Sequence, residues 1–178
     1  MSEPRFIVDQ GDPLAGRLVY SDMEHSFRFE VASPADLEDR SGELGRTSVA
    51  IGTLQVELDI ASGRSLFVWG LHPRRRWDTS SAFPQRIRAG VVRLAGGTEL
   101  VRGVTVSIAE VGDWLTTYDE ESGWVRVGAR AHVDDDEQVL IATDTVLGLR
   151  AGLLSSIWLR PDLEDVIASG ALERDYDG

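Results

Sequence analysis

The sequence contains no cysteine, no lysine and no asparagine. Without cysteine there can be no disulfide, no thiolate nucleophile and no cysteine-ligated zinc or iron–sulfur site. Without lysine there is neither Schiff-base chemistry nor a Walker-type lysine on a bound phosphate. All 18 basic residues are therefore arginine. Because the codons of lysine and asparagine are rich in adenine, their joint absence favours a GC-rich bacterial genome as the source.

Long hydrophobic runs are also missing. The longest apolar stretches fall far short of the ~18 residues that a membrane-spanning helix needs. Residues 1–5 carry an acid and a proline where a secretory signal has basic residues followed by an apolar run. We therefore expect a cytoplasmic protein with no membrane partner.

Positive charge is scarce, because 30 acidic residues give the chain a formal net charge of −12. We expect no nucleic-acid partner, since binding to phosphates depends on cations that displace condensed counterions. An acidic surface of this kind also keeps a protein soluble. At 178 residues, of which 42% are hydrophobic, the chain is long enough to form one domain over residues 1–178 with its own core.

Hydrophobic residues recur with a period of two far more often than with a helical period, which is typical of half-buried strands. The segments that alternate are 25–31, 54–60, 104–109 and 124–133. Segments 65–71 and 139–142 are apolar on both faces and predict central strands. Turn residues separate many of these strands, and 150–152 predicts a hairpin between 143–149 and 153–159.

Helix signals are few and short. Residues 33–39 begin with a serine suited to the N-cap and a proline at the first helical position. Residues 161–169 form a second candidate, which Gly170 would end. Such short helices cannot connect many parallel strands, so the pattern predicts a mainly β fold, either an antiparallel β-sandwich or a closed β-barrel, with two short helices.

Two turns of the pattern Asp-x-x-Ser-Gly, at 59–63 and 119–123, lie 60 residues apart. Each follows one predicted strand and precedes another. They are consistent with two similar halves within the single domain, although the remaining segments scarcely match. The simpler interpretation is that the same residues occur independently in two turns because they suit a tight connection.

The first candidate binding segment is an arginine run after the strand 65–71. Guanidinium groups bind carboxylates or phosphates with two parallel hydrogen bonds and stack on aromatic rings. The run is also a local inversion of the acidic charge of the chain. A solvated loop is the alternative. The residues concerned are His72, Arg74, Arg75, Arg76 and Trp77.

The second candidate is one face of the strand 124–133. A period of two places Trp124, Arg126, Arg130 and His132 on the same side, opposite Val125 and Val127. Tryptophan and arginine are enriched where binding energy concentrates, so this face is a possible contact surface. Inside a barrel, the same side chains would instead line a ligand cavity. An ordinary solvent face is the third alternative.

No pattern selects a catalytic residue, a metal site or a cofactor. The run 134–137 clusters four acids but lacks the alternation of a calcium loop, so a charged hairpin turn is the better interpretation. The three histidines lack the spacing of a metal pair. Among the five tryptophans, Trp69 and Trp158 are expected in the core, whereas Trp77, Trp114 and Trp124 lie where tryptophan often marks a contact.

Three functions remain open at this stage. The first is a non-catalytic interaction protein that holds an acidic protein partner, or a second copy of itself, through its Arg/Trp-rich loop and sheet face. The second is a β-barrel that binds a small anionic ligand in its interior, with Arg126, Arg130 and His132 inside. The third is a small hydrolase or isomerase that uses carboxylates alone.

Overall fold

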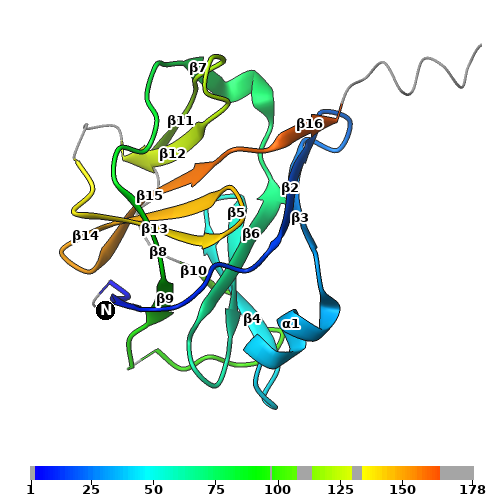
Figure 1. Ribbon diagram of the computed structural model, residues 1–178, viewed down its shortest axis with the longest axis vertical. Coiled ribbons are helices and arrows are strands. Elements are labelled where there is room, and N and C mark those ends of the chain that lie inside the picture. Colours follow the sequence, from blue (N-terminus) through cyan, green and yellow to red (C-terminus); the bar gives the residue numbers. More distant parts are fainter. Residues whose placement is uncertain (1–2, 97, 108–113, 130–133, 165–178) are drawn as a thin grey trace, which may run out of the picture.

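A computed structural model describes residues 3–96, 98–107, 114–129 and 134–164 of the chain. Short strands joined by tight turns account for most of it (Figure 1). The elements in chain order are β1 Phe6–Asp9, β2 Gly16–Ser21, β3 Ser26–Val31, α1 Pro34–Arg40, β4 Arg46–Ile51, β5 Leu54–Asp59, β6 Ser65–Leu71, the 3₁₀ turn η1 Arg74–Arg76, β7 Trp77–Thr79, β8 Ile87–Ala89, β9 Val91–Leu94, β10 Val106–Ser107, β11 Trp114–Tyr118, β12 Val125–Ala129, β13 Glu137–Ala142, β14 Thr145–Arg150, β15 Leu153–Leu159 and β16 Asp162–Glu164.

These strands form two seven-stranded sheets and a two-stranded ribbon. The first sheet has the order β10-β4-β5-β6-β3-β2-β16, and the second has the order β7-β11-β12-β15-β14-β13-β8. The ribbon pairs β1 with β9 in antiparallel register, and β9 packs near β6 and β13. The mainly β prediction is therefore confirmed.

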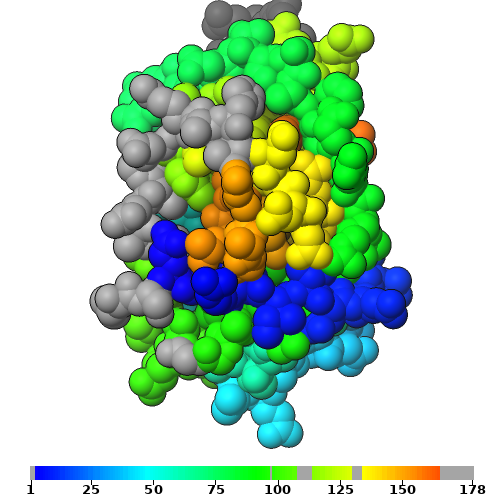
Figure 2. All heavy atoms as spheres, turned by 90° about the vertical axis from the view of Figure 1, so that its left-hand side faces the viewer, coloured from blue at the N-terminus to red at the C-terminus, as the bar shows by residue number. Residues whose placement is uncertain are grey.

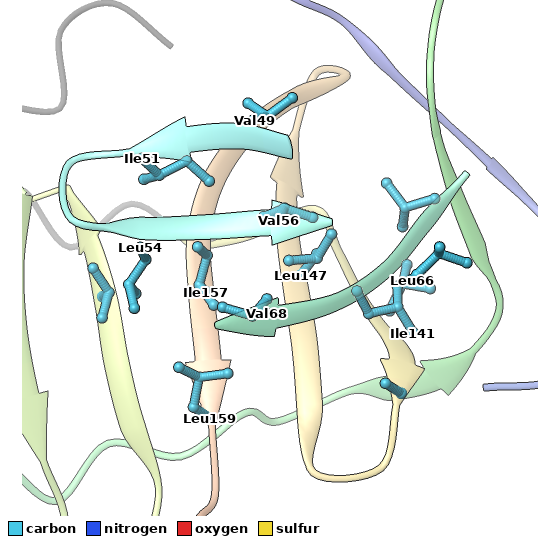
Figure 3. Close-up of a cluster of buried hydrophobic side chains, with 14 of the residues drawn as sticks. Val49, Ile51, Leu54, Val56, Leu66, Val68, Ile141, Leu147, Ile157 and Leu159 are labelled. Atoms are coloured by element: carbon cyan, nitrogen blue, oxygen red, sulfur yellow. The ribbon is translucent and has the colours of Figure 1, made fainter. Parts of the chain in front are cut away.

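The core lies between the two sheets, where both contribute apolar side chains from their inner faces (Figure 3). The alternation predicted for 54–60 is realised over 54–58, since Leu54, Val56 and Leu58 are buried while Gln55 and Glu57 face outward. It ends there, because the carboxylate of Asp59 is buried in the turn that follows. On the facing sheet, β14 and β15 supply Leu147 and Ile157 to the same core. Burial of these side chains is the main source of stability that the chain has available.

The stacked sheets agree with the sandwich alternative and not with a closed barrel. Within the described residues, each sheet ends in a separate edge strand on both sides, and no ladder joins the two ends. The interior ladders are antiparallel, as predicted, but each sheet ends in strands that pair in parallel. These edge pairs are β10 with β4, β16 with β2, β7 with β11 and β8 with β13.

The first predicted helix is present, whereas the described start of the second, residues 162–164, is a strand. The hydroxyl of Ser33 accepts a hydrogen bond from the backbone N–H of Asp36, and α1 follows from Pro34. Residues 162–164 of the second candidate form β16 instead, so the prediction of a helix there is wrong. Residues 165–169 lie outside the described part of the chain.

Tertiary pairing explains why β16 replaces the expected helix. The strand adds to the free edge of β2, which satisfies backbone groups that a sheet edge leaves unpaired. Leu163 packs against the core, while Asp162 and Glu164 form ion pairs with Arg17 and Arg28. A short segment has little intrinsic helix stability to oppose these contacts.

Both Asp-x-x-Ser-Gly turns form the same structure. In each, the Asp carboxylate accepts hydrogen bonds from the Ser backbone and hydroxyl, and the Gly adopts a positive φ. One turn joins β5 to β6 in the first sheet, and the other joins β11 to β12 in the second. A single domain over 1–178 with two similar halves stays a prediction.

The structure also bears on one predicted hairpin, one predicted strand and one tryptophan. The hairpin at 150–152 is confirmed, with Ala151 and Gly152 both at positive φ between β14 and β15. The strand predicted over 104–109 is reduced to the two residues of β10, and 108–109 lie outside the described residues. The expectation that Trp69 lies in the core is wrong. Its side chain is 37% exposed, because it lies on the outer face of β6 and its Nε1 donates a hydrogen bond to Glu57.

Candidate functional site

The outer face of the second sheet brings together side chains from four strands. The antiparallel register aligns Arg126 of β12, Trp158 of β15, Val146 of β14 and Leu140 of β13 in one row. The next row consists of Gly128, Ser156, Gly148 and Gln138. Two glycines therefore lie beside a serine and leave space above the sheet. We call this surface, together with the residues packed on it, the Arg126 site.

A segment of chain covers this surface because of the order of the strands. Strands β7 and β8 lie at opposite edges of the second sheet, so residues 80–86 between them must cross its outer face. Ser80 is hydrogen-bonded to Tyr118 of β11, and Ala82 packs on the cluster of Trp124, Val146 and Trp158. We call residues 80–86 the crossing segment.

The far end of the crossing segment is fixed to β13. The backbone N–H groups of Gln85 and Arg86 donate to the side-chain oxygen of Gln138, at 2.9 and 3.0 Å. Strand β8 then pairs with β13, and Figure 2 shows the green residues of β8 beside the yellow residues of β13. The crossing segment is thus held at both edges of the sheet.

Arg126 is buried on this face, with only 8% of its surface exposed. The guanidinium lies over Gly128, where an added Cβ would come within 2.9 Å of it, and it lies 5.6 Å from the ring centre of Trp158. Its one hydrogen bond within the described residues runs from Nη1 to the carbonyl of Ala129, at 3.3 Å. Burial lowers the pKa of the Arg126 guanidinium, and the charge of Asp135 opposes this shift. The group nevertheless stays charged.

Asp135 lies over the second row and is held by four side chains. Oδ1 accepts hydrogen bonds from the hydroxyls of Ser155 and Ser156, at 2.5 and 3.0 Å. Oδ2 accepts from Ser156, from Gln138 and from the Trp158 indole N–H. The carboxylate fits there because Gly148 has no side chain, since an added Cβ would lie 2.5 Å from it.

A pocket opens between these groups and the crossing segment. It has a volume of about 190 Å³ and is lined by Ala82, Phe83, Gln85, Arg126, Asp134, Asp135, Gln138 and Trp158. A second hollow of about 370 Å³ adjoins it, because the two share Gln85, Asp134, Asp135 and Gln138. Arg86 and Asp136 also line the second hollow. The Arg126 site therefore combines a buried cation with a cleft that a small molecule can enter.

The alternation of inward and outward side chains predicted for residues 124–133 is present at residues 124–127. Val125 and Val127 face the core, while Trp124 and Arg126 share the outer face. Neither outer residue is exposed: Ala82 of the crossing segment packs on the cluster that contains Trp124, and Arg126 lines a pocket together with residues of that segment. Arg126 therefore faces neither bulk solvent nor a barrel interior. Arg130 and His132 lie outside the described residues.

The arginine run forms a separate feature at the end of β6. His72, Trp77 and Tyr20 belong to an aromatic cluster, with 4.8 Å between the ring centres of Tyr20 and Trp77. The Tyr20 hydroxyl donates to the carbonyl of His72 and accepts from the backbone N–H of Arg74. The Arg74 guanidinium lies 5.3 Å from the ring centre of Tyr118 and forms an ion pair with Asp22. These three candidate residues therefore make contacts within the protein.

Arg75 and Arg76 are exposed, and neither guanidinium has a hydrogen-bond or ion-pair partner among the residues that the structure describes. The structure thus divides the predicted loop into a packed part, with His72, Arg74 and Trp77, and a free part of two arginines.

Trp114 is half-buried against the core, as is Trp77, whereas Trp158 is buried as expected, although in the outer cluster and not between the sheets.

His72 is the titratable group in the packed part of the loop. Its Nε2 lies 2.6 Å from the hydroxyl of Thr116, and its Nδ1 lies 3.2 Å from that of Thr53. Burial, assisted by the charge of Arg76, lowers the pKa of His72 to about 4. The imidazole is therefore neutral in the folded protein at neutral pH.

We expect this pKa to make stability depend on pH. Between pH 6.5 and 4 the unfolded chain binds a proton on His72 that the folded protein does not, so the free energy of unfolding falls as the pH is lowered through this range. The contribution is about 2–3 kcal/mol. Urea unfolding of the protein and of His72→Gln at both pH values measures it. The loss on acidification should be smaller in the variant, and equal losses would contradict the assignment.

Sequence reasoning finds Arg126 but misses the groups that make it a site. It assigns Asp135 to a charged turn and does not select Gly128, Gly148 or Ser156. The signal available in the sequence is one glycine inside each of two predicted strands, Gly128 in 124–133 and Gly148 in 143–149. Glycine inside a strand often marks close approach by another group. The identity of that group depends on the pairing of β12, β15, β14 and β13.

The described residues contain neither a metal centre nor a membrane-spanning helix. No group of three or more His, Asp or Glu side chains in that part of the chain could hold a metal ion. Among the helices of the same residues, none has the length and apolar character to cross a membrane. No protein-family model matches the chain, and no curated protein matches it significantly.

Proposed function

We propose that this protein is a non-catalytic binding protein that holds a small molecule by a carboxylate group in the Arg126 site. One observation carries the proposal: Arg126, a residue with only 8% of its surface exposed, has a single protein hydrogen bond in the described structure and lines an open pocket. A guanidinium has five N–H donors in a planar fork that matches a carboxylate. Buried donors usually have acceptors, so a ligand oxyanion is the expected partner.

The location of the pocket modifies the second function considered from the sequence. The ligand would lie on the outer face of a sheet, beneath the crossing segment, and not inside a barrel. Asp135 supports a binding role over carboxylate catalysis, because hydroxyl, amide and indole donors already occupy both its oxygens. The cytoplasmic location expected from the sequence is part of this proposal.

The test is a titration with simple carboxylates, hexanoate among them, followed by calorimetry. We expect millimolar or tighter binding to the protein and at least tenfold weaker binding to Arg126→Gln, since the variant loses a charged bidentate donor. Arg126→Lys keeps the charge without the planar fork and should bind with intermediate affinity. Circular dichroism and the melting temperature would establish that each variant is folded.

The matched control is the double variant Arg75→Gln/Arg76→Gln, which removes exposed arginines far along the chain from Arg126. It should bind carboxylates as the unaltered protein does. Binding that survives Arg126→Gln would refute the proposal. Binding that is lost only in the double variant would assign the anion to the arginine run instead.

That second outcome corresponds to the interaction protein considered from the sequence. We retain it as the second proposal because Arg75 and Arg76 are exposed and lack hydrogen-bond or ion-pair partners among the described residues. Its partner would present acidic groups, as a second copy of this chain does with a net charge of −12. Packing of Arg74 and Trp77 within the protein leaves this surface smaller than the sequence suggested.

A further inference from the structure

The charges that line the cleft do not suit a simple anion. Arg126 and Arg86 face three aspartates, so the lining carries more negative than positive charge. A ligand with only a carboxylate would gain from Arg126 but would be repelled by the acids around it. A ligand that also carries a positive group removes this repulsion.

The three aspartates differ in what they can offer a ligand. Both oxygens of Asp135 are occupied by protein donors, and Asp136 accepts a hydrogen bond from the backbone N–H of Ala151, at 2.8 Å. Asp134 is exposed and has no partner among the described residues. It also lines both the inner pocket and the adjoining hollow. Asp134 is therefore the carboxylate best able to receive a cation.

We propose that the ligand is a small dipolar molecule, an amino acid in the broad sense, with its carboxylate on Arg126 and an ammonium or guanidinium group on Asp134. The inference rests on the proposed function, because it takes Arg126 as the carboxylate-binding group. Two independent features carry it: a buried guanidinium that lines the inner pocket, and a free aspartate at the junction with the outer hollow. The outer hollow gives the intervening carbon chain room to extend.

The test compares three molecules of equal chain length at low ionic strength: hexanoate, 6-aminohexanoate and hexylamine. We expect 6-aminohexanoate to bind about three- to fivefold more tightly than hexanoate, as an additional exposed ion pair allows. Hexylamine should bind most weakly. The preference for the amino acid should decline as salt is added, since screening weakens exposed ion pairs.

Two variants assign the effect to its residue. Asp134→Asn should reduce the affinity for 6-aminohexanoate to that for hexanoate without weakening hexanoate binding. Asp39→Asn makes the same change of charge on α1 and should leave the preference intact.

The outcomes separate this inference from the proposed function. Equal binding of hexanoate and 6-aminohexanoate, lost in Arg126→Gln, would overturn the dipolar ligand and keep the carboxylate site. Failure of both carboxylates to bind would overturn both. Hexylamine binding that equals 6-aminohexanoate binding and is unaffected by Arg126→Gln would identify a cation site and would also overturn both.

Discussion

Replacement of Asp135 by alanine should lower the free energy of unfolding by at least about 2 kcal/mol, because it removes the shared acceptor of several part-buried hydrogen-bond donors. The carboxylate is the acceptor for Ser155, Ser156, Gln138 and Trp158, and its charge offsets that of Arg126. Alanine would leave these donors without an acceptor and the guanidinium without its nearby counter-charge, each at a cost in desolvation. Urea denaturation followed by tryptophan fluorescence measures the change.

Two further variants show which property of Asp135 matters. Asp135→Asn keeps one carbonyl acceptor and removes the charge. Its free energy of unfolding should therefore lie between those of the unaltered protein and Asp135→Ala. Asp78→Ala removes an exposed carboxylate and should change stability by less than about 0.5 kcal/mol. If Asp135→Ala were as stable as Asp78→Ala, the hydrogen bonds around Asp135 would not have the structural importance inferred here.

Replacement of Leu147 by alanine should cost about 2–5 kcal/mol, the range for buried leucines. Leu147 lies on β14, is 0% exposed and belongs to the core between the sheets. Figure 3 shows it pointing toward Val56 on the opposite sheet. Truncation would leave a cavity between the sheets. The sheets cannot close it without displacing other side chains packed between them, so the cavity would collapse only in part. Thermal and urea unfolding both measure the loss.

Leu44→Ala provides the control for the same chemical change at the surface. Leu44 is 61% exposed, so its truncation should alter the free energy of unfolding by less than about 0.5 kcal/mol. A small effect at Leu147, similar to that at Leu44, would mean that the two sheets are not packed tightly against each other there.

Local sequence is sufficient for the elements with strong local signals. The alternation in 25–31 and 54–60 makes one face of each segment apolar, and β3 and residues 54–58 of β5 form with that face inward. Ser33 and Pro34 define the start of α1 through contacts within a few residues. The turns at 59–63 and 119–123 depend on an aspartate that bonds its own neighbours.

Elements that depend on distant partners are predicted less well. Residues 162–164 have helical signals but gain more from pairing with β2 than a short helix can supply. Trp69 lies in an apolar strand, yet the side of that strand which faces the core is set by the register with β5. Neither outcome is visible in the residues next to it in the chain.

The Arg126 site illustrates the same division. The period of two residues in β12 is enough to place Trp124 and Arg126 together on one face. Whether that face meets solvent, a barrel interior or another segment depends on β7 and β8 lying at opposite edges of the sheet. The crossing segment follows from that order of strands, and with it the burial of Arg126.

By itself, the sequence determined that the chain folds mainly as strands, that these strands bury one face, and that neither thiol nor lysine chemistry is available. Those properties follow from side-chain identity and from a backbone period of two residues. Only the tertiary structure decided which strands are neighbours. It thereby placed Asp135 above Gly148 and left the guanidinium of Arg126 beside a cleft, because contacts between residues far apart in the chain arise only when the strands pair.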